Sequence, residues 1–197
     1  MFSCITVKRN NTMCINNNII DIYNTTKKRK YEFNDNIIVK QCFSKGHIHR
    51  QDGPAIITYN RNYIVTADWL KHGVVHNIKN PARICYYYGH GGLETEEWYE
   101  NGNMHRLDGP AQMWYDYNGI IHAETWCKDG KTQRTDKNKP SVIFYTCDGN
   151  ISCEEWFENG LLSRKEKPAA IVYDDNGKII LKKWYKNGKQ QNNCSIQ

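Results

Sequence analysis

The stretch WYENGNMHRLDGPAQMWYDYNGIIHAETW, residues 98–126, decides the fold, because its pattern recurs along the chain. It begins and ends on a tryptophan, and a glycine follows each of these two residues by four positions. The same spacing returns every 27 to 30 residues, with Cys42 at the aromatic position of the first such unit. A period of this length is typical of repeat architectures. The glycines are Gly46, Gly73, Gly102, Gly130, Gly160 and Gly188.

Further columns of residues keep the same period. A proline recurs once in each full unit, and a tyrosine follows each proline by five positions. Proline cannot donate a ladder hydrogen bond, so we expect these prolines at strand starts. The prolines are Pro54, Pro81, Pro110, Pro140 and Pro168; the tyrosines are Tyr59, Tyr86, Tyr115, Tyr145 and Tyr173; the tryptophans at the aromatic position are Trp69, Trp98, Trp126, Trp156 and Trp184.

Each unit reads as strand, turn, strand, turn. Alternation places Ala111, Met113 and Tyr115 on one face of a strand, and the turn ending at Gly119 leads into a second strand that runs to Trp126. The sequence therefore predicts an all-β protein, an elongated open antiparallel β-meander of about six and a half repeats, each of about 28 residues and two strands. A closed propeller would want about four strands per roughly 40-residue blade, so this period argues against it.

The repeat divides the chain into three segments. Residues 1–41 form a lone N-terminal strand and a degenerate first unit over residues 13–41, in which Tyr31 precedes Cys42 by eleven residues, as Tyr115 precedes Trp126. Residues 42–188 form the regular array, and residues 189–197 form a C-terminal tail. We expect no separate globular domain and no linker.

The motif HRLDGPA, residues 105–111, has the composition of an active site, but HRQDGPA at residues 49–55 repeats it. Two identical catalytic centres in one small chain would be unusual, so the motif is expected to build a turn. Aspartate would accept backbone N–H groups, arginine would pair with it or stack on an aromatic ring, glycine would allow a sharp bend, and histidine would pack at the turn. These structural residues are His49, Arg50, Asp52, Gly53, Pro54, His105, Arg106, Asp108, Gly109 and Pro110.

Catalysis by the pairs His49/Asp52 or His105/Asp108 stays open as a weaker hypothesis, because no nucleophile, oxyanion donor or metal set recurs with them. Histidines at matching positions of successive units would lie about 9.6 Å apart, too far to share one metal ion. We therefore expect no catalytic residues, no metal, no cofactor and no small-molecule substrate. The acids before each tryptophan are expected to form a solvated face, offset by Arg and Lys of neighbouring strands. They are Glu96, Glu97, Glu124, Glu154 and Glu155.

The net charge of +6 and the eight cysteines restrict the setting of the protein. The run KKRK at residues 27–30 suggests nuclear targeting or nucleic-acid contact, but a solvated turn is the favoured interpretation. The cysteines include no CxxC pair, and the N-terminus has no apolar segment of the kind that directs secretion. No run of 18 apolar residues occurs. A cytoplasmic protein with reduced thiols, neither secreted nor membrane-spanning, is expected.

The segment WYENGNMHRLDG, together with EEWFENG and KKWYKNG, resembles MORN repeats, whose units run as an aromatic strand, an NG turn, then a His and a Gly. The resemblance covers residues 40–190 well. Here the unit is longer than the family's, and HRxDGPA replaces the usual HGxG, which is similar to a divergent MORN variant of giant DNA viruses and some bacterial proteins. The resemblance implies a non-catalytic, elongated β-sheet for protein scaffolding, often dimeric, with lipid binding in some members.

Three functions follow as hypotheses. The first is an interaction scaffold that binds a protein partner or a second copy of itself, acting in the cytoplasm of an infected cell or in a virion if the protein is viral. The second is a peripheral lipid or nucleic-acid binder that uses Lys27–Lys30 with Arg50 and Arg106. The third, a hydrolase, would need a pocket, which open single sheets seldom provide. Candidate interaction aromatics are Trp69, Trp98, Tyr115, Trp126, Trp156 and Trp184, although at least two thirds of the aromatic rings are expected to pack within the sheet.

Overall fold

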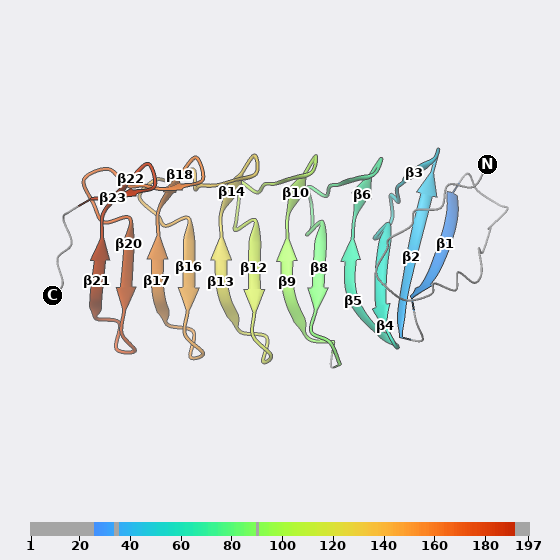
Figure 1. Ribbon diagram of the computed structural model, residues 1–197, viewed down its shortest axis with the longest axis horizontal. Helices are drawn as coiled ribbons and strands as arrows, with labels where there is room; N and C mark the ends of the chain where they lie inside the picture. Colours follow the sequence, from blue (N-terminus) through green and yellow to red (C-terminus); the bar gives the residue numbers. More distant parts are fainter. Residues whose placement is uncertain (1–25, 34–35, 90, 192–197) are drawn as a thin grey trace.

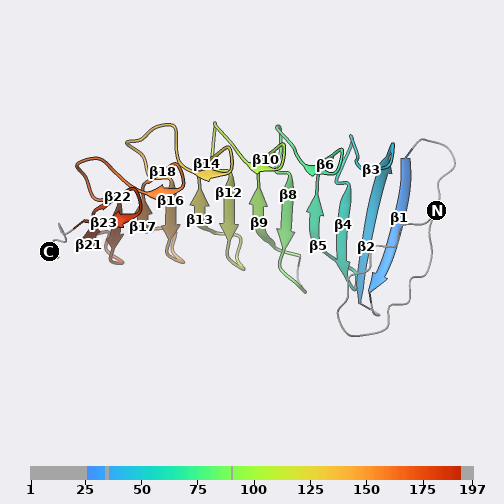
Figure 2. The ribbon, with the colours of Figure 1, turned by 45° about the horizontal axis from the view of Figure 1, so that its top comes forward.

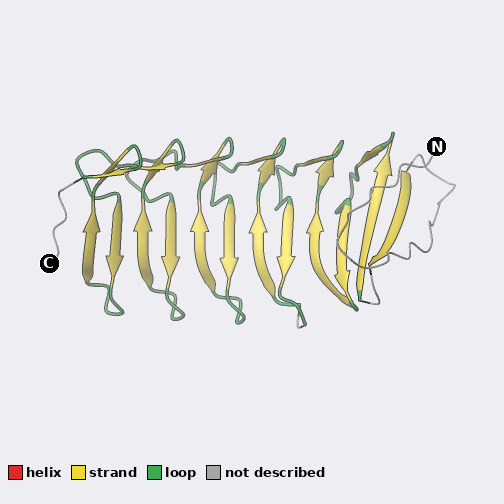
Figure 3. Ribbon diagram, in the orientation of Figure 1, coloured by secondary structure: helices red, strands yellow, loops and turns green. Residues whose placement is uncertain are grey.

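The computed structural model describes residues 26–33, 36–89 and 91–191. Within these ranges there is no helix, and the chain forms one long antiparallel sheet with short hairpins beside it (Figure 3). The sheet is open, and its first and last strands lie at opposite ends of an elongated molecule (Figure 1). The predicted all-β meander is therefore confirmed.

The long strands pair in the order in which they occur along the chain. Twelve of them form a continuous path, and the short strand β3 (His47–Ile48) pairs with β2 to give a sheet of 13 strands. The path runs through β1 (Thr26–Phe33), β2 (Ile37–Ser44), β4 (Ile56–Asn60), β5 (Tyr63–Asp68), β8 (Arg83–Tyr86), β9 (Leu93–Glu97), β12 (Gln112–Tyr115), β13 (Ile121–Thr125), β16 (Val142–Tyr145), β17 (Ile151–Glu155), β20 (Ala170–Tyr173) and β21 (Ile179–Lys183).

Each unit also contains a short hairpin that the sequence did not predict. These hairpins form five separate two-stranded sheets in a row along one edge of the long sheet (Figures 1 and 2). Each strand has two residues, too few to show an alternating pattern. The hairpins are β6 (Leu70–Lys71) with β7 (Val74–Val75), β10 (Tyr99–Glu100) with β11 (Asn103–Met104), β14 (Cys127–Lys128) with β15 (Lys131–Thr132), β18 (Phe157–Glu158) with β19 (Leu161–Leu162), and β22 (Tyr185–Lys186) with β23 (Lys189–Gln190).

The recurring glycines occupy the turns of these short hairpins. Asn101 and Gly102 both have positive φ, 49° and 82°, which matches a two-residue turn of type I′. The opposite edge of the sheet uses another turn, in which Gly119 alone has positive φ, 80°. There Asp116 Oδ1 accepts hydrogen bonds from the backbone N–H groups of Asn118 and Ile120, both at 2.8 Å. The positive φ expected at Gly119 is confirmed, whereas the cap by Asp116 was not anticipated.

The register aligns equivalent residues of all units in rows across the sheet. Directly paired residues share a face, and alternate residues of a strand lie on opposite faces. One row of uncharged residues crosses all twelve strands of the path, and we call its side the Trp114 face. The other side, which carries Arg106, Arg134 and Arg164, is called the arginine face. The row comprises Tyr31, Val39, Thr58, Thr66, Cys85, Thr95, Trp114, Ala123, Phe144, Cys153, Val172 and Leu181.

A column of small residues is buried at the edge of the sheet that adjoins the short hairpins. The residue after each proline is almost fully buried, and its backbone continues the ladder, as where Ala111 N–H donates to Thr125 O at 2.8 Å. The prolines therefore precede strand starts, as predicted. Because no larger side chain fits at this depth, every unit has alanine or serine there. The column is Ala55, Ala82, Ala111, Ser141 and Ala169.

The first hairpin differs from the expected register. Tyr31 pairs with Val39 in the row of Trp114, one position away from the column of Tyr115. The reason is that β1 and β2 pair without the irregularity found between Trp114 and Tyr115. The remainder of the degenerate unit, residues 13–25, lies outside the described residues.

The run KKRK is also not a turn. It lies within β1, so its residues alternate between faces, with Arg29 on the Trp114 face and Lys28 and Lys30 on the opposite one. Arg29 stacks over the ring of Phe43, with 4.5 Å from its Cζ to the ring centroid. At the other end of the chain, β23 reaches Gln190, two residues beyond the boundary expected at 188.

Candidate functional site

The arginine of the HRLDGPA motif makes both of the contacts that the sequence suggested. Arg106 Nε donates to Asp108 Oδ1 at 3.0 Å, and its guanidinium carbon lies 4.2 Å from the ring centroid of Trp98. Arg106 Nη1 also donates to Pro110 O at 3.3 Å. In the other copy, Arg50 Nε donates to Asp52 Oδ1 at 2.9 Å. The arginine thus joins the loop to the tryptophan beneath it.

The glycine that precedes the proline lies in a bend and also permits a close approach of the arginine. Gly109 and Gly53 are not among the residues with positive φ. A Cβ atom on Gly109 would lie 2.7 Å from Arg106 Cζ, and one on Gly53 would lie 3.0 Å from Arg50 Cζ. Gly53 and Gly109 lie in a bend before the proline, as expected, and they also leave room for the guanidinium group.

In three units a histidine ties the unit to the turn of the next one. His105 Nδ1 accepts the backbone N–H of Asp129 at 3.1 Å, and His49 Nδ1 accepts that of His72 at 3.3 Å. His76 repeats the contact with Asn101 at 3.1 Å. A backbone bond adds to each link, as where Gly130 N–H donates to Met104 O at 3.0 Å. Histidine does lie at a turn, but the turn belongs to the following repeat.

Aspartate does not cap the turn as expected. The Asp108 side chain is 86% exposed and bonds to Arg106, whose guanidinium lowers the pKa of that carboxyl. Asp52 pairs with Arg50 in the same way, with its pKa also lowered. In both copies histidine and aspartate therefore bond to different groups. The pairs His49/Asp52 and His105/Asp108 are not assembled as a base and its orienting acid.

Two altered copies of the motif, at residues 133–140 and 163–168, keep the arginine contacts without the acid. Arg134 lies 3.8 Å from the ring centroid of Trp126, and Arg164 lies 3.7 Å from that of Trp156. Each also donates to a proline carbonyl, at 3.2 and 3.3 Å. Within the described residues, neither arginine has a carboxylate at ion-pair distance. Burial lowers the pKa of both side chains, which marks them as incompletely compensated cations.

The acids on the arginine face accept hydrogen bonds from tyrosines. Tyr115 Oη donates to Glu96 Oε2 at 2.7 Å, and the bond recurs from Tyr145 to Glu124 at 2.9 Å and from Tyr173 to Glu154 at 2.5 Å. Burial, together with these bonds, raises the pKa of all three tyrosines well above the usual range. Glu96, Glu124 and Glu154 are therefore half-buried rather than fully solvated, although Glu124 and Glu154 also attract Arg134 and Arg164 electrostatically, as expected.

The acids on the other face follow a mixed pattern. Glu97 Oε1 and Oε2 accept hydrogen bonds from Gln112 and Tyr99, both at 3.0 Å, and Glu97 lies 3.9 Å from Arg83 Nη1. Arg83 Nε also donates to Asp68 at 2.5 Å. Burial raises the pKa of Tyr99 to about 12 and also raises the pKa of Glu155. The expected offset by arginine is thus present at Glu97.

Three of the six candidate interaction aromatics serve packing. Trp98, Trp126 and Trp156 are only 8%, 9% and 5% exposed beneath their arginines, so we assign no partner contact to them. Trp69, Trp184 and Tyr115 are half-buried. The sequence analysis missed Trp114, which is 39% exposed. Its signal was visible, because Trp114 is the one tryptophan of six that stands outside the repeat column.

The described part of the chain contains no group of three or more His, Cys, Asp or Glu side chains arranged to hold a metal ion. Over the same residues, no helix has the length and apolar character needed to cross a membrane. In comparisons with known proteins, no family model and no curated sequence matches this chain.

Proposed function

We propose that the protein is a non-enzymatic scaffold that binds a protein partner through its Trp114 face. The observation that carries this proposal is the pair Trp114 and Phe144, which are 39% and 37% exposed within a row of uncharged residues. Both rings stand on strands of an extended sheet, so little side-chain entropy is lost when they bind. Aromatic residues in such positions are preferred anchors of protein interfaces.

A small residue lies between these two anchors. Ala123 pairs directly with both Trp114 and Phe144, and it is buried. The two rings lie on strands about 9.6 Å apart, with only a methyl group between them.

Two observations favour a scaffold over catalysis. The histidine, arginine and aspartate of each HRxDGPA motif bond to separate groups of the loop and of the next repeat. The tryptophans near them are covered by arginine. The alternative of lipid or nucleic-acid binding through Lys27–Lys30, Arg50 and Arg106 has less support, since that run is divided between faces and both arginines pair with aspartate.

The resemblance to MORN repeats extends the proposal. It supports a dimer as one form of the scaffold, and its variant in giant DNA viruses supports a role in an infected cell or virion. Sedimentation equilibrium of the purified protein tests the dimer directly. A monomer at high concentration would leave a different protein as the partner.

The test compares two pairs of exposed aromatics in capture experiments from the native cell. Trp114→Ala/Phe144→Ala should lose partners that the wild type retains, because truncation of an anchor costs about 1–2 kcal/mol or more per residue. Tyr88→Ala/Tyr117→Ala is the matched control, since both tyrosines lie in turns rather than on the Trp114 face and are more exposed, at 52% and 69%. Equal capture by both variants, with both folded, would contradict the assignment of the Trp114 face.

A further inference from the structure

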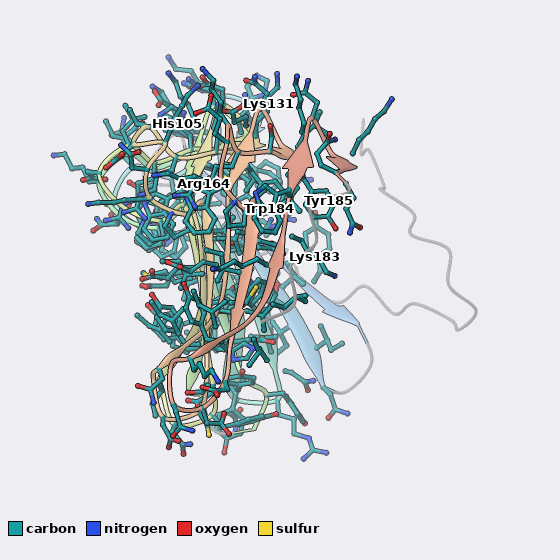
Figure 4. All side chains as sticks on the ribbon, turned by 90° about the vertical axis from the view of Figure 1, so that its left-hand side faces the viewer. His105, Lys131, Arg164, Lys183, Trp184 and Tyr185 are labelled. Atoms are coloured by element: carbon teal, nitrogen blue, oxygen red, sulfur yellow. The ribbon has the colours of Figure 1, made fainter. Side chains whose placement is uncertain are left out.

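The stacking of repeats gathers positive charge at one place in the array. Two adjoining hollows, of about 450 and 240 Å³, lie beside the hairpins β14–β15 and β18–β19 and the loops that follow them. Arg134 and Lys137 line both hollows. We call the two hollows together the Arg134 groove. Two of its cations, Lys131 and Arg164, come from successive repeats (Figure 4).

The groove carries an excess of positive charge. The smaller hollow is lined by Arg134, Arg164 and four lysines, and the larger adds Lys128 and Lys131. Two acids, Asp129 and Glu158, stand against these eight cations, so the formal excess is six. Asp136 and Glu166 stand between these lining residues in the sequence, so residues 128–139 and 158–167 together carry an excess of four, out of a net charge of +6 for the chain of 197 residues. The groove is therefore basic and holds a large share of the excess charge.

Of the two acids of the groove, Glu158 is already engaged, because its Oε1 lies 3.5 Å from Lys137 Nζ. Asp129 Oδ1 lies 3.0 Å from His105 Nδ1, but that nitrogen accepts the backbone N–H of Asp129 and so has no proton to donate to the carboxylate. Over the residues that the structure describes, Arg134 and Arg164 have carbonyl partners but no carboxylate at ion-pair distance. A partly buried guanidinium without an acid gains most from an anion that arrives from outside.

We infer that the Arg134 groove binds an acidic, extended segment of a protein partner. Successive repeats are two strands apart, about 9.6 Å, and so are equivalent cations. A polyproline II chain rises about 3.1 Å per residue with three residues per turn, so every third side chain returns to the same side after about 9.3 Å. Carboxylates at every third position of such a segment therefore match the spacing of the cations from one repeat to the next.

The aromatic residues of the groove argue against nucleic acid as its ligand. Single-stranded nucleic acids bind where bases can stack on exposed rings. Trp156, which lines the groove, is 5% exposed, and Arg164 covers its ring. Carboxylates need only the cations at the surface. The inference rests on the proposed function in one respect, that the partner is a protein, but it concerns a different face.

The test measures fluorescence polarisation of a labelled peptide of repeated Glu-Pro-Pro triplets with the full chain. The groove variant Lys137→Gln/Lys139→Gln/Lys165→Gln removes three exposed lysines. It should weaken binding by roughly tenfold, because each rim charge contributes a small, additive attraction. The control Lys45→Gln/Lys71→Gln/Lys79→Gln removes the same charge away from the groove and should weaken binding by less than about twofold. Thermal unfolding checks that both variants are folded.

Three results would overturn the inference: no binding of the acidic peptide to the wild type, equal weakening by both lysine variants, or equal binding of a Gln-Pro-Pro peptide. Groove-dependent binding of oligothymidylate without binding of the acidic peptide would also overturn it in favour of nucleic acid. Trp114→Ala/Phe144→Ala should bind the acidic peptide as the wild type does. A negative peptide-binding result at the Arg134 groove therefore does not affect the capture result for the Trp114 face. A negative capture result likewise does not affect the peptide-binding result.

Discussion

The two intact loops, residues 49–55 and 105–111, and the two altered loops, residues 133–140 and 163–168, hold their arginines differently. In an intact loop the guanidinium lies against a glycine and bonds to an aspartate, as Arg106 does with Asp108 at 3.0 Å. In the altered loops lysine replaces that glycine, and the guanidinium lies closer to the tryptophan ring. In the intact loops, the aspartate thus neutralises the charge of the arginine. In the altered loops, no aspartate of the described chain pairs with the arginine, so its charge is available to a partner.

The largest expected change in stability tests whether the buried residue after the proline is packed equally tightly in both kinds of loop. Ala111→Leu and Ser141→Leu each place a large side chain in the buried column after the proline. Both should lower the free energy of unfolding by about 3 kcal/mol, since no space exists for the added atoms. Urea unfolding measures the change, and Ala111→Ser, which copies residue 141, is the control. If Ser141→Leu lowered the free energy of unfolding much less than Ala111→Leu does, the altered loops would pack less tightly than the intact ones.

A smaller effect should separate the two kinds of loop. Arg106→Gln removes an ion pair and a stack on Trp98, so we expect a loss of about 1–2 kcal/mol. Arg134→Gln removes a stack on Trp126, but it also removes a charge that burial disfavours, as the lowered pKa of Arg134 indicates. Its loss should stay below about 1 kcal/mol. The opposite order in chemical unfolding would refute the view that altered loops carry uncompensated charge.

The smallest effect should be the same in both regions. The pKa of Tyr115 and of Tyr173 is raised in the folded state by burial and by their glutamate partners. A raised folded pKa stabilises the protein fully below the unfolded value of about 10, and this stability is lost as the pH rises above it.

Tyr115→Phe and Tyr173→Phe should each cost about 1 kcal/mol at pH 7 and flatten the fall in stability above about pH 10. Urea unfolding at a series of pH values measures this, with tyrosinate absorbance as a second signal. Tyr88→Phe serves as a control, because Tyr88 is 52% exposed. A difference in slope between the two variants would show that the tyrosine–glutamate bonds are not equivalent.

Much of the fold could be predicted because single residue types impose it. Glycine at Gly102 tolerates positive φ, and proline at Pro110 cannot donate a hydrogen bond, so their period determines where chains turn and strands begin. The short hairpins could not be predicted, since strands such as β10 and β11 have two residues each. The first hairpin was placed one residue off because its pairing lacks the irregularity of later units.

The candidate sites were harder to foresee for different reasons. The Arg134 groove joins Lys128–Lys139 to Arg164–Lys167, which come together only when repeats stack. Trp114 could have been identified, because it departs from the tryptophan column, but its exposure depends on the small neighbour Ala123 in the next strand. Sequence periodicity shows what the units share. Contacts between units decide which side chains remain exposed.

The order of the long strands has a consequence for how the chain acquires its structure. Every long strand pairs with its nearest neighbours along the chain, so the pairing contacts are local in sequence. Such low contact order favours fast folding, and a repeat array can add units one after another from any point. During synthesis, each repeat that leaves the ribosome finds the edge of the preceding one ready as a template. That same growing edge is where a second nascent chain can pair by mistake, until the next repeat of its own chain covers it.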